Sequence, residues 1–242
     1  MRLIYAKTGS DGNCVIYENS SGKRLMVDSG VSVSEVNKNI GFSMSKVKNI
    51  LITHHHQDHT KYILEYLERG IHVLMGSQTR AYLDIPEKYN YYITEIKPKE
   101  LIVLDNEFYI KPFELPHINV DGTPCFNLGY LINSKTDKEK VLHCTDCQYI
   151  PYQFYGLDRI VIECNFISPQ SYVSQQGYIN EFVEQRRLVS HMSLFAVEEF
   201  LKKQDLSKLK QIKLIHLSND YSHRKDIMKA RVKKIVGIDV EI

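Results

Sequence analysis

Short apolar segments separated by Gly, Asn, Asp or Pro recur along both halves of the chain. In the N-terminal half they span 2–7, 13–19, 23–30, 47–54 and 71–76. In the C-terminal half they span 100–116, 127–134, 140–148, 158–165 and 211–218. Short apolar runs bounded by turn residues are typical of β-strands.

Three other segments carry the 3.6-residue apolar period of helices, namely 59–70, 179–188 and 193–204. Both halves are therefore rich in strands, and two of the three helices come late. This pattern favours an α/β fold with two packed sheets and outer helices, a four-layer αββα sandwich, over a doubly wound sheet of alternating elements. Because no repeat or long linker interrupts the pattern, we predict a single domain over 1–242.

Composition narrows the class of partner. The 31 Lys and Arg against 29 Asp and Glu give a net charge of +2, and no long basic run is present, which argues against a protein that grips long nucleic acid. The N-terminus turns polar by Lys7, and no apolar run approaches the roughly 18 residues of a membrane span. We therefore expect a cytoplasmic protein without a signal peptide or a membrane partner.

Cysteine usage agrees with a reducing compartment. The five cysteines are an odd number, scattered except for the CTDC sequence at 144–147, which predicts reduced thiols. CTDC is also the pattern of half a zinc ribbon, although the chain has no second pair of this kind.

The stretch LITHHHQDHTKYI at 51–63 places four histidines and an aspartate in six positions. In an extended strand end, His54 and His56 project to the same side, so both imidazoles can meet one ion. The following turn carries Asp58 and His59 toward a second ion. This nitrogen and oxygen donor set suits zinc, with manganese as the alternative. The alternative interpretation is a solvated loop that is rich in histidine by accident.

Two ions need more ligands than this loop supplies. His117, Asp146 and His216 each follow an apolar run, and a carboxylate at Asp146 could bridge both ions. Each of these residues alone could be structural, but together they complete two sites of plausible coordination.

The order of these residues resembles the metallo-β-lactamase fold superfamily over nearly the whole chain. The match consists of HxHxDH at 54–59, then His117, Asp146 and His216, with Asp28 in LMVDSG as the early aspartate. The resemblance implies the αββα fold and two metal ions. It also implies their ligands: His54, His56 and His117 on one ion, Asp58, His59 and His216 on the other, and Asp146 as the bridge. Asp28 would fix the tautomer of a histidine from behind, or it is merely a turn residue.

Within the superfamily, Asp58 and the late HLS turn at 216–218 resemble the ribonuclease Z and phosphodiesterase branch. The segments from His117 to Asp146 and from Asp146 to His216 are too short for a tRNA-binding arm or for the inserted domain of the exonuclease branch. Among the compact members, the sequence resembles the anti-Pycsar family, phage and bacterial phosphodiesterases that destroy cyclic nucleotide immune signals. This resemblance implies hydrolysis of 3′,5′-cyclic mononucleotides such as cCMP and cUMP in a bacterial host cell. We also expect a homodimer.

The proton donor is harder to identify. The sequence departs from the superfamily pattern at Ile118 and Asn119, at Cys147, and in Glu163-Cys164-Asn165, where ribonuclease Z has a His-Glu pair. His191 is our candidate general acid, because imidazole can donate a proton near pH 7. His191 could instead only pack beside a helix start.

Two further residues complete the predicted catalytic surroundings. Glu163 would orient His191 or a metal ligand, or it is a solvated carboxylate at a strand end. His223 is the weaker candidate for the acid and otherwise belongs, with Asp28, to the shell around the ligands. The predicted catalytic residues are thus Asp58, His191 and Glu163. We expect His72 and His143 to be ordinary strand residues.

Tyrosines could hold the flat part of a substrate. The chain has 16 Tyr and no Trp, and tyrosines gather in 89–92 and 168–178. Tyr91 and Tyr172 are our candidates for stacking on a base, and the alternative is that both segments are ordinary surface loops.

Other functions fit the same motifs. An RNA or DNA nuclease of the ribonuclease Z or 5′ exonuclease type, and a metal-dependent hydrolase of another small ester, use the same fold. A binding protein without metal is the least favoured, because all seven ligand positions carry competent residues.

Overall fold

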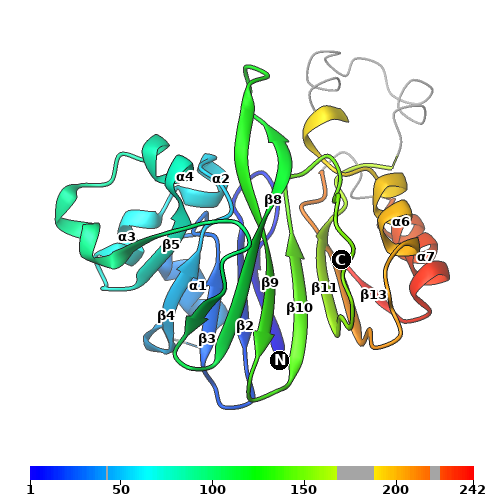
Figure 1. Ribbon diagram of the computed structural model, residues 1–242, viewed down its shortest axis with the longest axis horizontal. Coiled ribbons are helices and arrows are strands. Elements are labelled where there is room, and N and C mark those ends of the chain that lie inside the picture. The colour runs from blue at the N-terminus through cyan, green and yellow to red at the C-terminus, as the bar shows by residue number, and fades with distance from the viewer. Residues whose placement is uncertain (42, 168–187, 219–223) are drawn as a thin grey trace. The chain divides into compact units, whose positions relative to one another are not determined.

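The computed structural model describes residues 1–41, 43–167, 188–218 and 224–242. The chain divides into two units: unit 1 comprises 1–113 and 130–139, and unit 2 comprises 114–129 and 140–242. The described residues form a six-stranded and a seven-stranded sheet with helices (Figure 1). The predicted α/β class with two sheets is therefore confirmed.

The six-stranded sheet belongs to unit 1 and follows the order of the sequence. Its strands are β1 (Arg2–Lys7), β2 (Cys14–Glu18), β3 (Arg24–Val27), β4 (Val47–Leu51), β5 (His72–Gly76) and β6 (Ile93–Ile96). The first three strands are antiparallel, and the pairs from β3 to β6 are parallel. The carboxyl ends of β3, β4 and β5 therefore lie side by side.

Short helices connect these strands. They are α1 (Val33–Asn39), η1 (Met44–Lys46), α2 (Gln57–Thr60), α3 (Ile63–Leu67), α4 (Ser77–Tyr82) and η2 (Glu87–Tyr92). One buried cluster joins Ile16 and Ile50 of the sheet to Val36 of α1 and Leu67 of α3. Burial of this apolar surface fixes the strand ends from which unit 1 presents its polar side chains.

The seven-stranded sheet has the order β13-β12-β11-β10-β9-β8-β7. Its strands are β7 (Ile102–Leu104), β8 (Phe108–Ile118), β9 (Pro124–Ser134), β10 (Glu139–Cys144), β11 (Arg159–Glu163), β12 (Gln211–Ile215) and β13 (Val240–Glu241). The strands from β10 to β13 are parallel. The helices of unit 2 include α6 (Leu194–Lys202) and α7 (Lys225–Val236).

Several boundaries differ from the sequence prediction. The predicted strand 100–116 is two strands, because Asp105 and Asn106 take positive φ and form a tight turn. The predicted helix 59–70 is two short helices, α2 and α3, and the predicted helix 193–204 is confirmed as α6. The predicted helix 179–188 lies outside the described residues except for Leu188.

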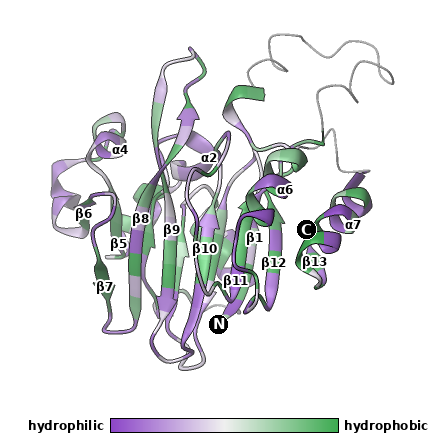
Figure 2. Ribbon diagram, turned by 45° about the vertical axis from the view of Figure 1, so that its right-hand side comes forward, coloured by the Kyte–Doolittle hydropathy of each residue, from purple (hydrophilic) through white to green (hydrophobic). Residues whose placement is uncertain are grey.

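Helix α7 was not predicted. Only Met228 and Val232 of α7 are buried, and its colouring is mainly hydrophilic (Figure 2). Its apolar residues do not all fall on one face, since Ile227 is 50% exposed, and this gives a weak periodic signal. Among the helices of the described residues, none is both long enough and apolar enough to cross a membrane.

Candidate metal centre

In unit 1, the chain leaves β4 and enters residues 53–60, which we call the metal loop. Backbone hydrogen bonds tie this loop to its neighbours: Asn13 N donates to Asp58 O at 2.7 Å, and Ser29 N donates to His59 O at 2.7 Å. Gly30 packs so closely that a Cβ there would lie 1.6 Å from Asp58 O. The loop backbone is thus held from two sides, and position 30 has no room for a side chain.

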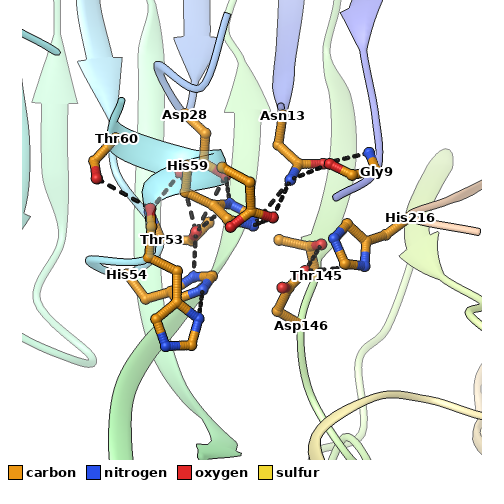
Figure 3. A network of polar contacts seen from close by, with 12 residues as sticks. Gly9, Asn13, Asp28, Thr53, His54, His59, Thr60, Thr145, Asp146 and His216 are labelled. Atoms are coloured by element: carbon orange, nitrogen blue, oxygen red, sulfur yellow. Dashed lines mark hydrogen bonds and ion pairs between the residues drawn. The ribbon is translucent and has the colours of Figure 1, made fainter. Parts of the chain in front are cut away.

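Asp28 anchors the histidines of the metal loop from behind (Figure 3). Its Oδ2 lies 2.7 Å from His59 Nδ1, and its Oδ1 accepts from Thr53 N at 2.8 Å and from Thr53 Oγ1 at 3.0 Å. Burial raises the pKa of the Asp28 carboxyl, although His59 and Thr53 both favour its charged form. The predicted role of Asp28 as a tautomer-fixing residue therefore has a geometric basis.

This network sets which nitrogen of each histidine can bind a metal. Thr53 Oγ1 gives its one proton to Asp28, so it accepts from His54 Nδ1, 3.0 Å away. His59 donates from Nδ1 to Asp28 in the same way. Both rings then present Nε2 as the atom with a lone pair, which is the state a metal ligand needs.

The two remaining ligand candidates of the loop lie next to these rings. His54 Nε2 and His56 Nδ1 are 3.0 Å apart, so both nitrogens converge on one point as the alternation of side chains predicted. His59 Nε2 and Asp58 Oδ2 are 3.3 Å apart. The four candidate ligands of unit 1 thus form two adjacent donor pairs.

Asn13 joins this cluster and was missed in the sequence. Its Nδ2 lies 3.0 Å from Asp58 Oδ2 and 3.0 Å from His59 Nε2. Its Oδ1 accepts from Gly9 N at 2.9 Å, and the same amide donates to Gly9 O at 3.1 Å. The only signal in the sequence is a polar residue just before a strand, which is too common to identify a ligand-positioning residue.

Unit 2 gathers its polar residues at the carboxyl ends of parallel strands. Asp146 follows β10, Glu163 ends β11 and His216 follows β12, and all three are buried. Since these strands are neighbours with parallel register, their ends meet at one side of the sheet.

Glu163 is the centre of the unit 2 cluster. Its Oε1 lies 2.6 Å from His191 Nδ1 and 2.9 Å from His216 Nδ1, and its Oε2 accepts from Cys147 N at 3.0 Å. Burial would raise the pKa of the Glu163 carboxyl, but the charge and hydrogen bond of His191 and the hydrogen bond of His216 lower it below its usual value. Glu163 is therefore an anion that holds Nδ1 of both histidines, so each ring presents Nε2.

Asp146 is held by its own set of contacts. Thr145 Oγ1 donates to Asp146 Oδ1 at 2.6 Å, and Asn127 Nδ2 donates to the Asp146 carbonyl at 2.7 Å. His216 Nδ1 lies 3.4 Å from the same Oδ1, and Figure 3 shows Thr145, Asp146 and His216 together. Asn127 was not predicted from the sequence, and its contact joins β9 to the residues that follow β10.

His117 lies near the end of β8 and is also buried. Its Nδ1 is 3.1 Å from Ser190 O, and a carbonyl can only accept, so His117 donates from Nδ1 and presents Nε2. The His117 ring lies edge-on to His191 with 5.9 Å between centroids.

The donor chemistry of the described residues fits a divalent metal. In unit 2, Asp146, Glu163, His191 and His216 offer ligand atoms that all lie within 4.8 Å of one another. Imidazole nitrogens and carboxylate oxygens are the ligands of zinc and, with more oxygen, of manganese.

The described structure does not bring Tyr91 to the metal loop. Tyr91 lies beside His72, with 6.1 Å between ring centroids, and His72 begins β5, whereas the metal loop follows the carboxyl end of β4. Tyr172 and His223 lie outside the described residues. His143 is a buried residue of β10, consistent with its expected structural role.

Cys144 and Cys147 belong to no group that could hold a metal ion in the described part of the chain. All five cysteines are unbonded to one another and buried, and burial raises the pKa of Cys144 and Cys147. The structure thus gives no support to the half zinc ribbon.

Comparison with known proteins gives a family and a fold. The family model described as the beta-lactamase superfamily domain matches residues 23–217. Among curated proteins, none matches the sequence.

Three solved structures illustrate the fold. The metallo-beta-lactamase fold protein YhfI from Bacillus subtilis is 14% identical, with a TM-score of 0.68 over 99% of this chain and 95% of YhfI. Yeast PDE1 is 12% identical, with a TM-score of 0.70 over 99% and 96%. The short form of human tRNase Z is 16% identical, with a TM-score of 0.65 over 91% and 94%. At these identities the likeness concerns the fold, and it confirms the predicted metallo-β-lactamase fold.

Proposed function

The chain belongs to the beta-lactamase superfamily, and on this premise we propose that it is a metal-dependent phosphodiesterase that hydrolyses 3′,5′-cyclic mononucleotides. The observation that carries the proposal is that candidate histidines of both units are hydrogen-bonded through Nδ1 to a carboxylate or a hydroxyl group. Asp28 with Thr53 in unit 1, and Glu163 in unit 2, each take Nδ1 protons and leave Nε2 as the presented nitrogen. Carboxylate and hydroxyl partners of this kind orient metal-binding histidines.

The proposed centre takes two zinc ions, with manganese as the alternative, in the ligand scheme that the superfamily resemblance implies. The proposed ligands are His54, His56 and His117 for one ion, Asp58, His59 and His216 for the other, and Asp146 as the bridge. Two such ions, when bound, would lower the pKa of a water and neutralise phosphate oxygens that gain charge during attack.

The chain's own residues supply the proton for the leaving group. His191 is about one-fifth exposed at its side chain, and its Nδ1 is held by buried Glu163. When the His191 ring carries a proton on both nitrogens, Nδ1–H stays bonded to Glu163 and the Nε2 proton is the one that can pass to the departing 3′-oxygen. Glu163 fixes the direction of that donation, and the buried carboxylate is kept charged by the contacts described above.

Two observations support the proposed substrate class. Proteins that share the fold include one named PDE1 and one named tRNase Z, and the second acts by its name on a polymer of phosphodiesters. The net charge of +2 provides little attraction for a long nucleic acid. A small cyclic nucleotide is therefore our choice, and the resemblance to the anti-Pycsar family suggests that the biological role is removal of an antiphage signal.

The test is a substrate panel. Purified protein with zinc or manganese is incubated with cyclic mononucleotides, cyclic dinucleotides and short RNA, and the products are separated by chromatography. We expect cyclic mononucleotides to give nucleoside 5′-monophosphates. His56→Ala should abolish the reaction, and His72→Ala serves as the matched control, because His72 lies at the amino end of β5. If the protein trims RNA ends and leaves cyclic mononucleotides intact, the proposed function is wrong and the protein is a nuclease.

A further inference from the structure

Within unit 1, an aromatic pair joins the metal loop to the exposed Tyr82 of α4. The ring of His55, between the candidate ligands His54 and His56, stacks on the ring of Tyr82 with 4.1 Å between centroids and 10° between planes. His55 and His56 are also in contact, with centroids 5.0 Å apart. The tyrosine is therefore connected to a candidate ligand through one intervening ring.

The topology of the sheet explains why Tyr82 lies there. β4 and β5 are parallel neighbours, so the loop after β4 and the helix after β5 start at the same end of the sheet. Helix α4 begins directly after Gly76, and Tyr82 is its last residue. Figure 1 shows α2 and α4 at this same end.

The backbone around Tyr82 is held firmly. Arg80 Nη1 donates to Leu83 O at 3.0 Å, and Arg80 Nη2 donates to Ile85 O at 3.1 Å. These bonds close the turn that follows α4. A large ring on a fixed turn, with one face on His55, loses little conformational freedom when a ligand covers it.

Most of the Tyr82 side chain is nevertheless accessible. The residue is 65% exposed, although one face of its ring is covered by His55. Tyr91 is more exposed, at 80%, but it lies beside His72 at the amino end of β5. Among the tyrosines described in unit 1, Tyr82 is thus the exposed one that stacks on a residue of the metal loop.

We propose that Tyr82, supported by His55, forms a stacking surface for a flat aromatic group of the substrate. The inference rests on the proposed function, in which that group is the base of a nucleotide whose phosphate is held at the metal loop. Aromatic side chains stack on any base, so this surface gives affinity for a base without strong choice among bases.

The first experiment uses the absence of tryptophan from the chain. Tyr82→Trp places a single tryptophan at the proposed surface, and a base that stacks on an indole quenches its fluorescence. Tyr155→Trp is the matched control, because Tyr155 is 64% exposed and its carbonyl is bonded to Lys140 near the start of β10. The metal-loaded variants are titrated with CMP, AMP and ribose 5-phosphate.

We expect CMP and AMP to quench the indole fluorescence of the Tyr82→Trp variant saturably, whereas ribose 5-phosphate should leave it unchanged. The Tyr155→Trp variant should show no saturable quenching by any of the three compounds. Absence of saturable quenching at position 82, or equal quenching at both positions, would overturn the inference. The readout does not depend on turnover, so it separates this inference from the proposed function.

The second experiment compares Tyr82→Ala with Tyr82→Phe in hydrolysis of a 3′,5′-cyclic mononucleotide and of the corresponding base-free cyclic ribose phosphate. Loss of stacking should raise KM for the nucleotide about tenfold or more in Tyr82→Ala, while Tyr82→Phe stays near the unmodified protein. The base-free compound should show the same KM in all three proteins. Hydrolysis with an unchanged KM in Tyr82→Ala would overturn the stacking surface and leave the proposed function standing. Quenching in the Tyr82→Trp variant without hydrolysis of any cyclic nucleotide by the unmodified protein would overturn only the proposed function.

Discussion

Replacement of Asp28 by asparagine tests the hydrogen-bond network behind the metal loop by changing one oxygen to an NH₂ group. The Oδ1 contacts to Thr53 N and Oγ1, at 2.8 and 3.0 Å, can remain. The new NH₂ group, however, would face His59 Nδ1, which is 2.7 Å from Oδ2 in the native chain. Two donors cannot share this contact, so His59 must move its proton to Nε2.

A proton on Nε2 blocks the nitrogen that His59 presents for a metal. Loss of such an orienting partner typically weakens metal affinity by about 10- to 100-fold, or about 1.4 to 2.8 kcal/mol. The fold should be less affected. Burial already raises the pKa of Asp28, so the amide removes a disfavoured buried charge while it loses one charge-assisted hydrogen bond. We expect the free energy of unfolding of the metal-free variant to lie within about 2 kcal/mol of that of the metal-free native chain.

The assay is competition for zinc between the protein and a chromophoric chelator, with urea unfolding of the metal-free proteins in parallel. Asp11→Asn is the control, since the side chain of Asp11 is 74% exposed. Nitrogen chemical shifts of His59 report which ring nitrogen carries the proton. Native zinc affinity in Asp28→Asn, with the proton of His59 still on Nδ1, would refute the tautomer argument.

Three further predictions concern other parts of the chain. His191→Ala should slow hydrolysis of a cyclic nucleotide by about 100-fold or more but keep most activity on a nitrophenyl phosphodiester, whose leaving group needs no proton. Equal losses of activity on the two substrates would make His191 a positioning residue. Gly30→Ala places a Cβ 1.6 Å from Asp58 O, so urea unfolding should show a loss of about 1 to 3 kcal/mol, and an unchanged midpoint would contradict the packing. Hydrogen bonds from Thr136 and Ser134 outweigh burial and lower the pKa of Glu107 to about 2. The stabilising effect of the Glu107 carboxylate is therefore present above the unfolded-state pKa near 4.5 and is lost as the pH falls toward 2. Glu107→Gln should lower the free energy of unfolding by about 1 to 3 kcal/mol at pH 6 and by much less at pH 2. A loss of stability that is as large at pH 2 as at pH 6 would refute this prediction.

The strand ends that carry the candidate ligands could be predicted from the sequence, because the end of a strand depends on a local pattern of residues. The apolar run before His54 and the polar turn after it mark the end of a strand wherever they occur. The same holds for Asp146 and His216, which follow β10 and β12 as expected. Their grouping within unit 2 then follows from the parallel register of neighbouring strands.

The partners of these ligands could not be predicted in the same way. Asn13 reaches Asp58, and Asn127 reaches the carbonyl of Asp146, across distances in sequence that no local pattern encodes. Among the tyrosines, the dense stretch 89–92 gave the stronger signal in the sequence. The strand order, however, places Tyr91 at the amino end of β5 and Tyr82 beside the metal loop, and strand order is a property of the tertiary fold.

Backbone conformation at the ends of strands shows why particular residue types occupy this side of each sheet. Asp28, Asp146 and His216 each follow a strand and have positive φ, at 64°, 50° and 54°. Aspartate and histidine are among the few residue types other than glycine that enter this region with some frequency, and each still stores strain of about 1 kcal/mol or more there. Glycine would remove the strain, but it would also remove the Asp28 carboxylate that contacts His59, the Asp146 carboxylate that contacts His216, or the His216 ring that contacts Glu163. The strained turn therefore persists where a strand must end sharply and still present a polar side chain. Replacement of Asp28, Asp146 or His216 by glycine should leave a folded chain with weakened metal binding.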